Sequence, residues 1–128
     1  MDRQTRISVY QKAERELLVT DAEIVLPGRG LQYIGRIAQL STEGCVIETK
    51  CQLEPGTTVE VWMRTERMPL RVMANIVERR AGGMEFRFQP MPNRKMDQIE
   101  ILRGELADAA RAAELAGVKG AQSDTKMV

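Results

Sequence analysis

Residues 39–48, with the sequence QLSTEGCVIE, are the stretch of this chain whose residue types and spacing best suit the binding of an anion. Ser41 and Gly44 stand three residues apart in a short polar turn, and the residues that follow alternate between apolar and polar as in a β-strand. Serine and glycine also occur at such turns without any ligand. The spacing therefore predicts either an ordinary turn or a pocket for an anion.

Histidine is absent from the 128 residues, which removes the commonest general base and the commonest metal ligand. If one strand carries both Cys45 and Cys51, they lie roughly 20 Å apart, against about 5.5–6 Å between the α-carbons of a disulfide. Two cysteines also fall short of the about four ligands of a zinc site. We therefore expect two reduced thiols in a cytosolic protein, no metal site and no Ser–His or Cys–His nucleophile.

The overall charge is balanced, with 19 Lys and Arg against 18 Asp and Glu and a net charge of +1. This balance does not demand nucleic acid or an anionic membrane as a partner, so anion binding requires locally clustered arginines. Aromatic residues make up 4%, too few for a platform that stacks single-stranded nucleic acid. Residues 1–18 are charged throughout and predict neither a secretory signal nor a membrane span. We expect a cytoplasmic, soluble protein without membrane insertion.

The middle of the chain alternates with a period of two residues, as strands do when one face is buried. Turn signals separate the segments at 27–30 (PGRG), 54–56 (EPG) and 81–83 (AGG). The residues predicted to face inward are Ala22, Ile24, Leu26, Cys45, Ile47, Val59, Val61, Met63, Leu70, Val72, Ala74, Ile76, Met84, Phe86 and Phe88. This pattern predicts an antiparallel, mainly β structure of about six strands, a small barrel or sandwich.

The pattern changes after Pro90 and Pro92, which end the last strand. From there apolar residues recur every three or four positions, at Met96, Ile99, Leu102, Leu106, Ala109 and Ala113. This spacing predicts an amphipathic helix that ends near Gly117. We divide the chain into an N-terminal arm (1–20), a barrel with a C-terminal helix (21–117) and a disordered tail (118–128).

The order of these segments resembles the PilZ domain, a bacterial receptor module for cyclic di-GMP. The segments that carry the resemblance are IAQLSTEGCVIE (37–48), LEPGTTVEVWM (53–63), MPLRVMANIVE (68–78) and GGMEFRF (82–88), followed by the helix. It covers roughly residues 15–105 and is stronger as a whole-chain pattern than at any single motif. The resemblance implies a small six-stranded antiparallel β-barrel with a C-terminal α-helix.

The family binds its ligand with RxxxR before the first strand and [D/N]xSxxG at the end of the second. By this resemblance Ser41 and Gly44 match the second signature in type and spacing, with the hydroxyl donating to a phosphate oxygen and the glycine allowing close approach. Gln39 stands where the family has the Asp or Asn that contacts a guanine edge. Glutamine keeps the amide groups, but its extra methylene shifts them outward.

The first signature is absent, because no RxxxR precedes the first strand. Arg15 stands at about the right distance to replace one arginine, and Arg3 and Arg6 form an RxxR further upstream that reaches the site only if the arm folds over the barrel mouth. In the family such arginines grip phosphates in fork geometry and stack on purine faces. The alternative for Arg15 is a solvated side chain on a charged arm.

The resemblance implies a protein that acts by binding, with no catalytic residues and no cofactor. Our first interpretation is a cyclic di-GMP-binding signalling or adaptor domain of weak affinity, whose ligand-induced surface a partner protein recognises. The alternative is a PilZ-like adaptor that binds no nucleotide and contacts a protein partner through the barrel surface or the C-terminal helix. A P-loop and a dinucleotide-binding glycine pattern are both missing, which argues against an enzyme.

Overall fold

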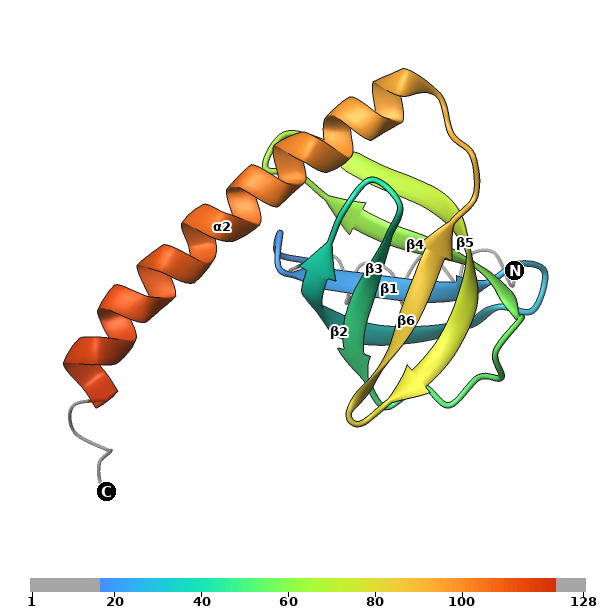
Figure 1. Ribbon diagram of the computed structural model, residues 1–128, viewed down its shortest axis with the longest axis horizontal. Coiled ribbons are helices and arrows are strands. Elements are labelled where there is room, and N and C mark those ends of the chain that lie inside the picture. Colours follow the sequence, from blue (N-terminus) through green and yellow to red (C-terminus); the bar gives the residue numbers. More distant parts are fainter. Residues whose placement is uncertain (1–16, 122–128) are drawn as a thin grey trace, which may run out of the picture.

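The structure, a computed structural model, describes residues 17–121 and consists of a closed antiparallel barrel followed by one long helix (Figure 1). The elements are β1 (Asp21–Leu26), β2 (Leu31–Leu40), β3 (Gly44–Thr49), β4 (Thr58–Arg64), β5 (Pro69–Arg80), β6 (Gly83–Phe88) and α2 (Asn93–Ala121). Around the barrel the strands follow the order β1-β2-β3-β6-β5-β4, and β4 pairs with β1 to close it. The predicted six-stranded barrel with a C-terminal helix is confirmed.

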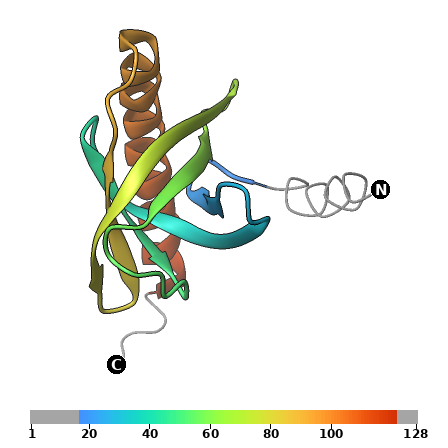
Figure 2. The same cartoon turned by 90° about the vertical axis from the view of Figure 1, so that its right-hand side faces the viewer.

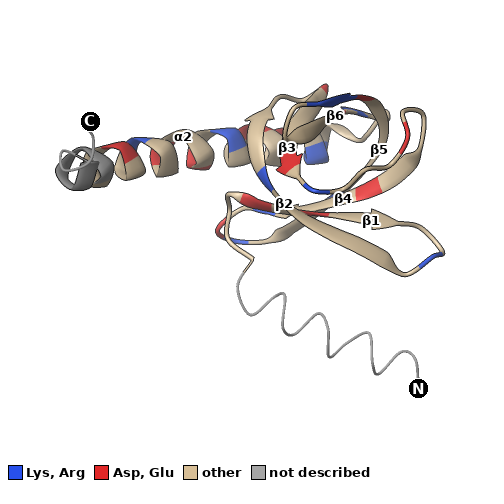
Figure 3. Ribbon diagram, turned by 90° about the horizontal axis from the view of Figure 1, so that it is seen from below, with Lys and Arg blue, Asp and Glu red and all other residues tan. Residues whose placement is uncertain are grey.

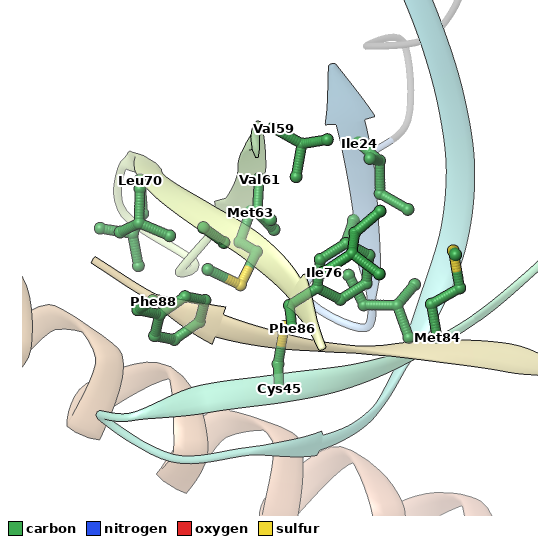
Figure 4. Packing of buried hydrophobic residues seen from close by; sticks show 14 of the residues in the cluster. Ile24, Cys45, Val59, Val61, Met63, Leu70, Ile76, Met84, Phe86 and Phe88 are labelled. Atoms are coloured by element: carbon green, nitrogen blue, oxygen red, sulfur yellow. The ribbon is translucent and has the colours of Figure 1, made fainter. Parts of the chain in front are cut away.

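The inward residues of every strand meet in one core, because alternate side chains of a strand point to opposite faces of the sheet. All of the residues predicted to face inward are buried, and Phe86 lies within the cluster shown in Figure 4. Each side chain of this size contributes about 1.5–3 kcal/mol when it is fully buried. The alternation of apolar and polar residues in the sequence therefore follows from the burial of one face of each strand in this core.

The first half of α2 closes one side of the barrel, because Ile99 and Leu102 are fully buried in the same core. Three polar contacts join the helix to the β4–β5 hairpin, and one of them runs from the Gln98 amide to the sulfur of Met68 at 2.8 Å. Glu105 accepts a hydrogen bond from the backbone N–H of Glu66 at 2.9 Å, and Lys95 donates to the carbonyl of Arg71 at 2.6 Å. Beyond these contacts the helix extends past the barrel (Figure 1), and Figure 2 shows the same helix behind the strands.

Strand β2 departs from strict alternation, because its register against β3 shifts between Ile37 and Gln39. This bulge allows both Ile37 and Leu40 to pack against the core, three residues apart, where a regular strand would turn one of them outward. It also leaves Gln39 and Ser41 exposed at the end of the strand. The bulge therefore explains the irregular hydrophobic pattern of strand β2.

The helix is longer than the sequence predicts, since it continues past Gly117 to Ala121. A helical glycine costs about 1 kcal/mol relative to alanine, which weakens a helix without having to end it. Residues 118–121 of the predicted disordered tail are thus helical, whereas residues 122–128 and most of the predicted arm lie outside the described residues. Within residues 17–121, no helix combines the length and the apolar character needed to span a bilayer.

Candidate ligand-binding site

The turn between β2 and β3 is built around the side chain of Ser41. Its Oγ accepts hydrogen bonds from the backbone N–H groups of Glu43 at 3.1 Å and Gly44 at 3.3 Å. The Ser41 N–H donates to the Gly44 carbonyl at 2.9 Å, and the hydroxyl lies 3.4 Å from the same carbonyl. The sequence left an ordinary turn and an anion pocket open for this stretch, and the structure shows that Ser41 does hold a turn together.

The hydroxyl of Ser41 nevertheless keeps a proton that it can donate to an anion. A serine Oγ has two lone pairs and one proton. Both acceptor positions are occupied by backbone N–H groups, while the proton has only the 3.4 Å contact to the Gly44 carbonyl, which is long for an O–H···O hydrogen bond. The proton can therefore turn toward a ligand oxygen without loss of the two bonds that shape the turn.

Gly44 is required by the barrel itself. A Cβ at this position would lie 2.1 Å from the carbonyl oxygen of Phe86, on the neighbouring strand β6, and 3.2 Å from the α-carbon of Arg87. Backbone atoms cannot move aside as the end of a side chain can. The glycine thus has a structural reason for its presence that is independent of any ligand.

A hollow of about 240 Å³ lies beside this turn, between the start of β3 and the end of β6. Its polar lining consists of Gln39, Ser41, Glu43, Glu85 and Arg87. Arg87 is the residue that the sequence analysis missed, and it comes next to the turn because it pairs with Gly44 across β3 and β6. Its outward position in MEFRF was visible in the sequence, but the pairing of these two strands was not.

The electrostatics of the hollow are mixed. Glu85 pairs with Arg80 at 2.6 Å, and the hydrogen bond and charge of Glu85 raise the pKa of the Arg80 guanidinium. Glu43 and Arg87 make no ion pair with any other residue in the described part of the chain. Figure 3 shows both signs of charge distributed over barrel and helix. The described residues alone therefore provide one available guanidinium and one available carboxylate.

The three predicted cations, Arg3, Arg6 and Arg15, lie outside the described residues, so their convergence on the turn remains a prediction. Thr20, near the start of the described residues, lies beside strand β2. The N–H of Ile37 donates to the carbonyl of Thr20 at 2.9 Å, two residues before Gln39. The structure thus brings Gln39, Ser41 and Gly44 together and adds Arg87.

The two cysteines are free and buried. Burial raises the pKa of the Cys45 thiol, and it also raises that of Cys51, where a backbone hydrogen bond to Leu53 acts in the opposite direction. Both groups are therefore neutral thiols with little thiolate character. Among residues 17–121, no group of three or more Cys, Asp or Glu side chains is arranged to hold a metal ion.

The strands and the turn together define a small closed barrel with a serine–glycine turn at its rim. A family model described as the PilZ domain matches residues 10–103, and the chain belongs to this family. PilZ domains are, in general, receptor modules for cyclic di-GMP and act by binding.

The barrel also matches a solved structure, the crystal structure of the PilZ domain of CeSA from a cellulose-synthesizing bacterium. The TM-score is 0.58 at 16% sequence identity, over 71% of this chain and 95% of that chain. At this identity the similarity supports the fold alone. No match was found among curated proteins.

Proposed function

We propose that this chain is a cyclic di-GMP-binding signalling domain whose site lies at the β2–β3 turn, and that its affinity is weak. The observation that carries the proposal is the geometry of Ser41, whose Oγ shapes the turn as an acceptor while its proton remains available to a phosphate oxygen. Arg87 adds a guanidinium without an ion pair among the described residues, beside the same turn. Because the ligand is an intracellular messenger, the proposal implies a cytoplasmic protein.

The short stretch of chain between Arg15 and Thr20 supports a contribution of Arg15 to ligand binding. Thr20 is hydrogen-bonded to Ile37 beside the site, and Arg15 precedes it by five residues. Five residues span at most about 18 Å when fully extended, so the Arg15 guanidinium remains within reach of the turn. Binding of a dianionic ligand would favour the state in which the leading segment lies against the turn, and a partner protein would recognise that state.

Three features favour weak binding. Gln39 replaces the shorter Asp or Asn of the family signature, and the RxxxR signature is absent. Glu43 and Glu85 line the hollow, where their carboxylates repel phosphates. Arg80 offsets the charge of Glu85 only in part, because both side chains are substantially exposed to solvent.

Titration calorimetry of the full chain with cyclic di-GMP tests the proposal. We expect saturable binding in the micromolar range that is lost in Arg15→Ala. Arg29→Ala is the matched control, because Arg29 is an exposed arginine in the turn at the opposite end of β2. If the wild type gives no binding heat at high ligand concentration, the proposal is refuted. If both variants lose the same amount of affinity, only the net charge of the protein matters.

The charge of the hollow favours a second candidate, an adaptor domain that binds no nucleotide. Two carboxylates against one guanidinium line it, and α2 exposes 55% of Ile101 and 67% of Leu115. These residues are fourteen positions apart, which places them near the same helix face. If the chain is such an adaptor, calorimetry with cyclic di-GMP should give no binding heat. Light scattering should then show self-association of the wild type, which Leu115→Glu should abolish. A single-chain mass for the wild type would argue against self-association through this face.

A further inference from the structure

A second concave surface adjoins the β2–β3 turn, between strand β2 and the part of α2 that leaves the barrel. This helix groove has a volume of about 380 Å³, within the range of small-molecule sites. Its lining comprises Thr20, Arg36, Ile37, Ala38, Gln39 and Leu40 on one wall and Arg103, Leu106, Ala107, Ala109, Ala110 and Ala113 on the other.

The groove exists because the barrel-facing residues of α2 become smaller along the helix. Ile99 and Leu102 are fully buried, and the same spacing continues through Leu106, Ala109 and Ala113. Leu106 still packs partly against the core, but the alanines have too little volume to fill the space beside β2. The result is a shallow apolar wall of methyl groups opposite a strand.

The charge of the helix groove differs from that of the hollow at the turn. Among the described residues that line it, none is acidic, whereas Arg36 and Arg103 are both basic. Arg103 is paired with Glu100 at 2.8 Å. Arg36 stands opposite Asp21 on β1 and Glu48 on β3, but makes no ion pair with either or with any other residue within 17–121.

An available guanidinium beside an apolar wall suits a ligand that combines a phosphate with a flat ring. Arginine binds phosphate oxygens in fork geometry, and a purine face packs against methyl groups. The helix groove is also continuous with the turn, because Gln39 and Leu40 line both the groove and the hollow beside Ser41.

We propose that the helix groove holds one nucleotide half of cyclic di-GMP, with Arg36 on its phosphate and the alanines of α2 against its guanine. This inference rests on the proposed function and extends it. Ser41 then contacts the other half from the hollow, and Gln39 lies between the two. Arg36 supplies from β2 a guanidinium that the missing RxxxR would otherwise provide, and α2 becomes part of the binding site.

Two variants test the inference by calorimetry with cyclic di-GMP at low ionic strength. Arg36→Ala should weaken binding by about 10- to 100-fold, the loss expected for a hydrogen bond to a charged group. Ala110→Leu places a larger side chain in the groove and should weaken binding by at least about tenfold. The matched controls are Arg29→Ala and Ala112→Leu, since both residues are exposed outside the groove.

Unchanged thermal unfolding of Arg36→Ala and Ala110→Leu ensures that lost binding reports on the site and not on the fold. Binding by the wild type together with wild-type affinity in either variant overturns the inference and leaves the proposed function intact. Absence of binding by the wild type itself overturns both the function and the inference. Weaker binding in both variants, with both controls close to the wild type, supports the groove.

Discussion

Gly44→Ala offers the sharpest test of how the candidate site is built. The family signature explains this glycine by the approach of a ligand, whereas the structure explains it by the approach of strand β6. The added Cβ would lie 2.1 Å from the Phe86 carbonyl oxygen. An ordinary contact between these atoms requires about 3.4 Å, so β3 and β6 would have to separate locally by more than an ångström.

The expected cost follows from this overlap. Overpacking usually costs 1–3 kcal/mol, and this clash falls on a backbone atom within a closed barrel, where rotamer changes give no relief. We therefore expect Gly44→Ala to lower the free energy of unfolding by about 3 kcal/mol or more. For a chain of this size, that corresponds to a fall in Tm of roughly 10–15 °C.

Urea and thermal unfolding without any ligand measure this effect, because the structural explanation does not involve a ligand. Gly104→Ala is the control, since a Cβ at this exposed helical glycine meets no atom within 4 Å. It should stabilise the protein by about 0.5–1 kcal/mol. If Gly44→Ala unfolds within 1 kcal/mol of the wild type, the barrel does not require the glycine and the structural explanation fails.

Two further predictions concern titration and charge. Burial raises the pKa of the Cys45 thiol, so the folded chain keeps a proton that the unfolded chain releases above about pH 8.5. This group should therefore leave stability unchanged below that pH and lower it by about 1.4 kcal/mol per pH unit above it, a slope that Cys45→Ala should reduce in urea unfolding at several pH values. Equal slopes in both proteins would contradict this. Glu43→Gln removes a carboxylate from the hollow and should strengthen cyclic di-GMP binding about two- to fivefold in calorimetry, whereas Glu54→Gln, outside the hollow, should have no effect. Unchanged or weaker binding in Glu43→Gln would show that this carboxylate does not face the ligand.

Most of the barrel follows from patterns of a few residues. The alternation in segments such as residues 59–63 and 84–88 is confirmed position by position, because burial on one face of a strand imposes a period of two. Strand β2 is less regular in sequence, and the bulge between Ile37 and Gln39 is the reason. The end of α2 was misplaced, because the cost of one glycine is small against the helix that precedes it.

The candidate site was predictable only in part. Ser41 and Gly44 form a local motif, and three residues of spacing suffice to find it. Glu43 lies within the same motif, whereas the contribution of Glu85 to the charge of the hollow depends on which strands become neighbours. Arg3, Arg6 and Arg15 remain predictions, because they lie outside the described residues.

The sequence by itself determined the nearly neutral overall charge of this protein, which is a sum over its residues. It also determined most of the elements and the serine–glycine turn, since each of these depends on residues close together in the chain. Only the tertiary structure decided that β3 pairs with β6, and hence that Gly44 faces the Phe86 carbonyl and Arg87 lines the hollow. In the same way, only the packing of α2 beside β2 brings Arg36 opposite a wall of alanines. These contacts join segments tens of residues apart, where local periodicity carries no information about which strand or helix becomes the neighbour.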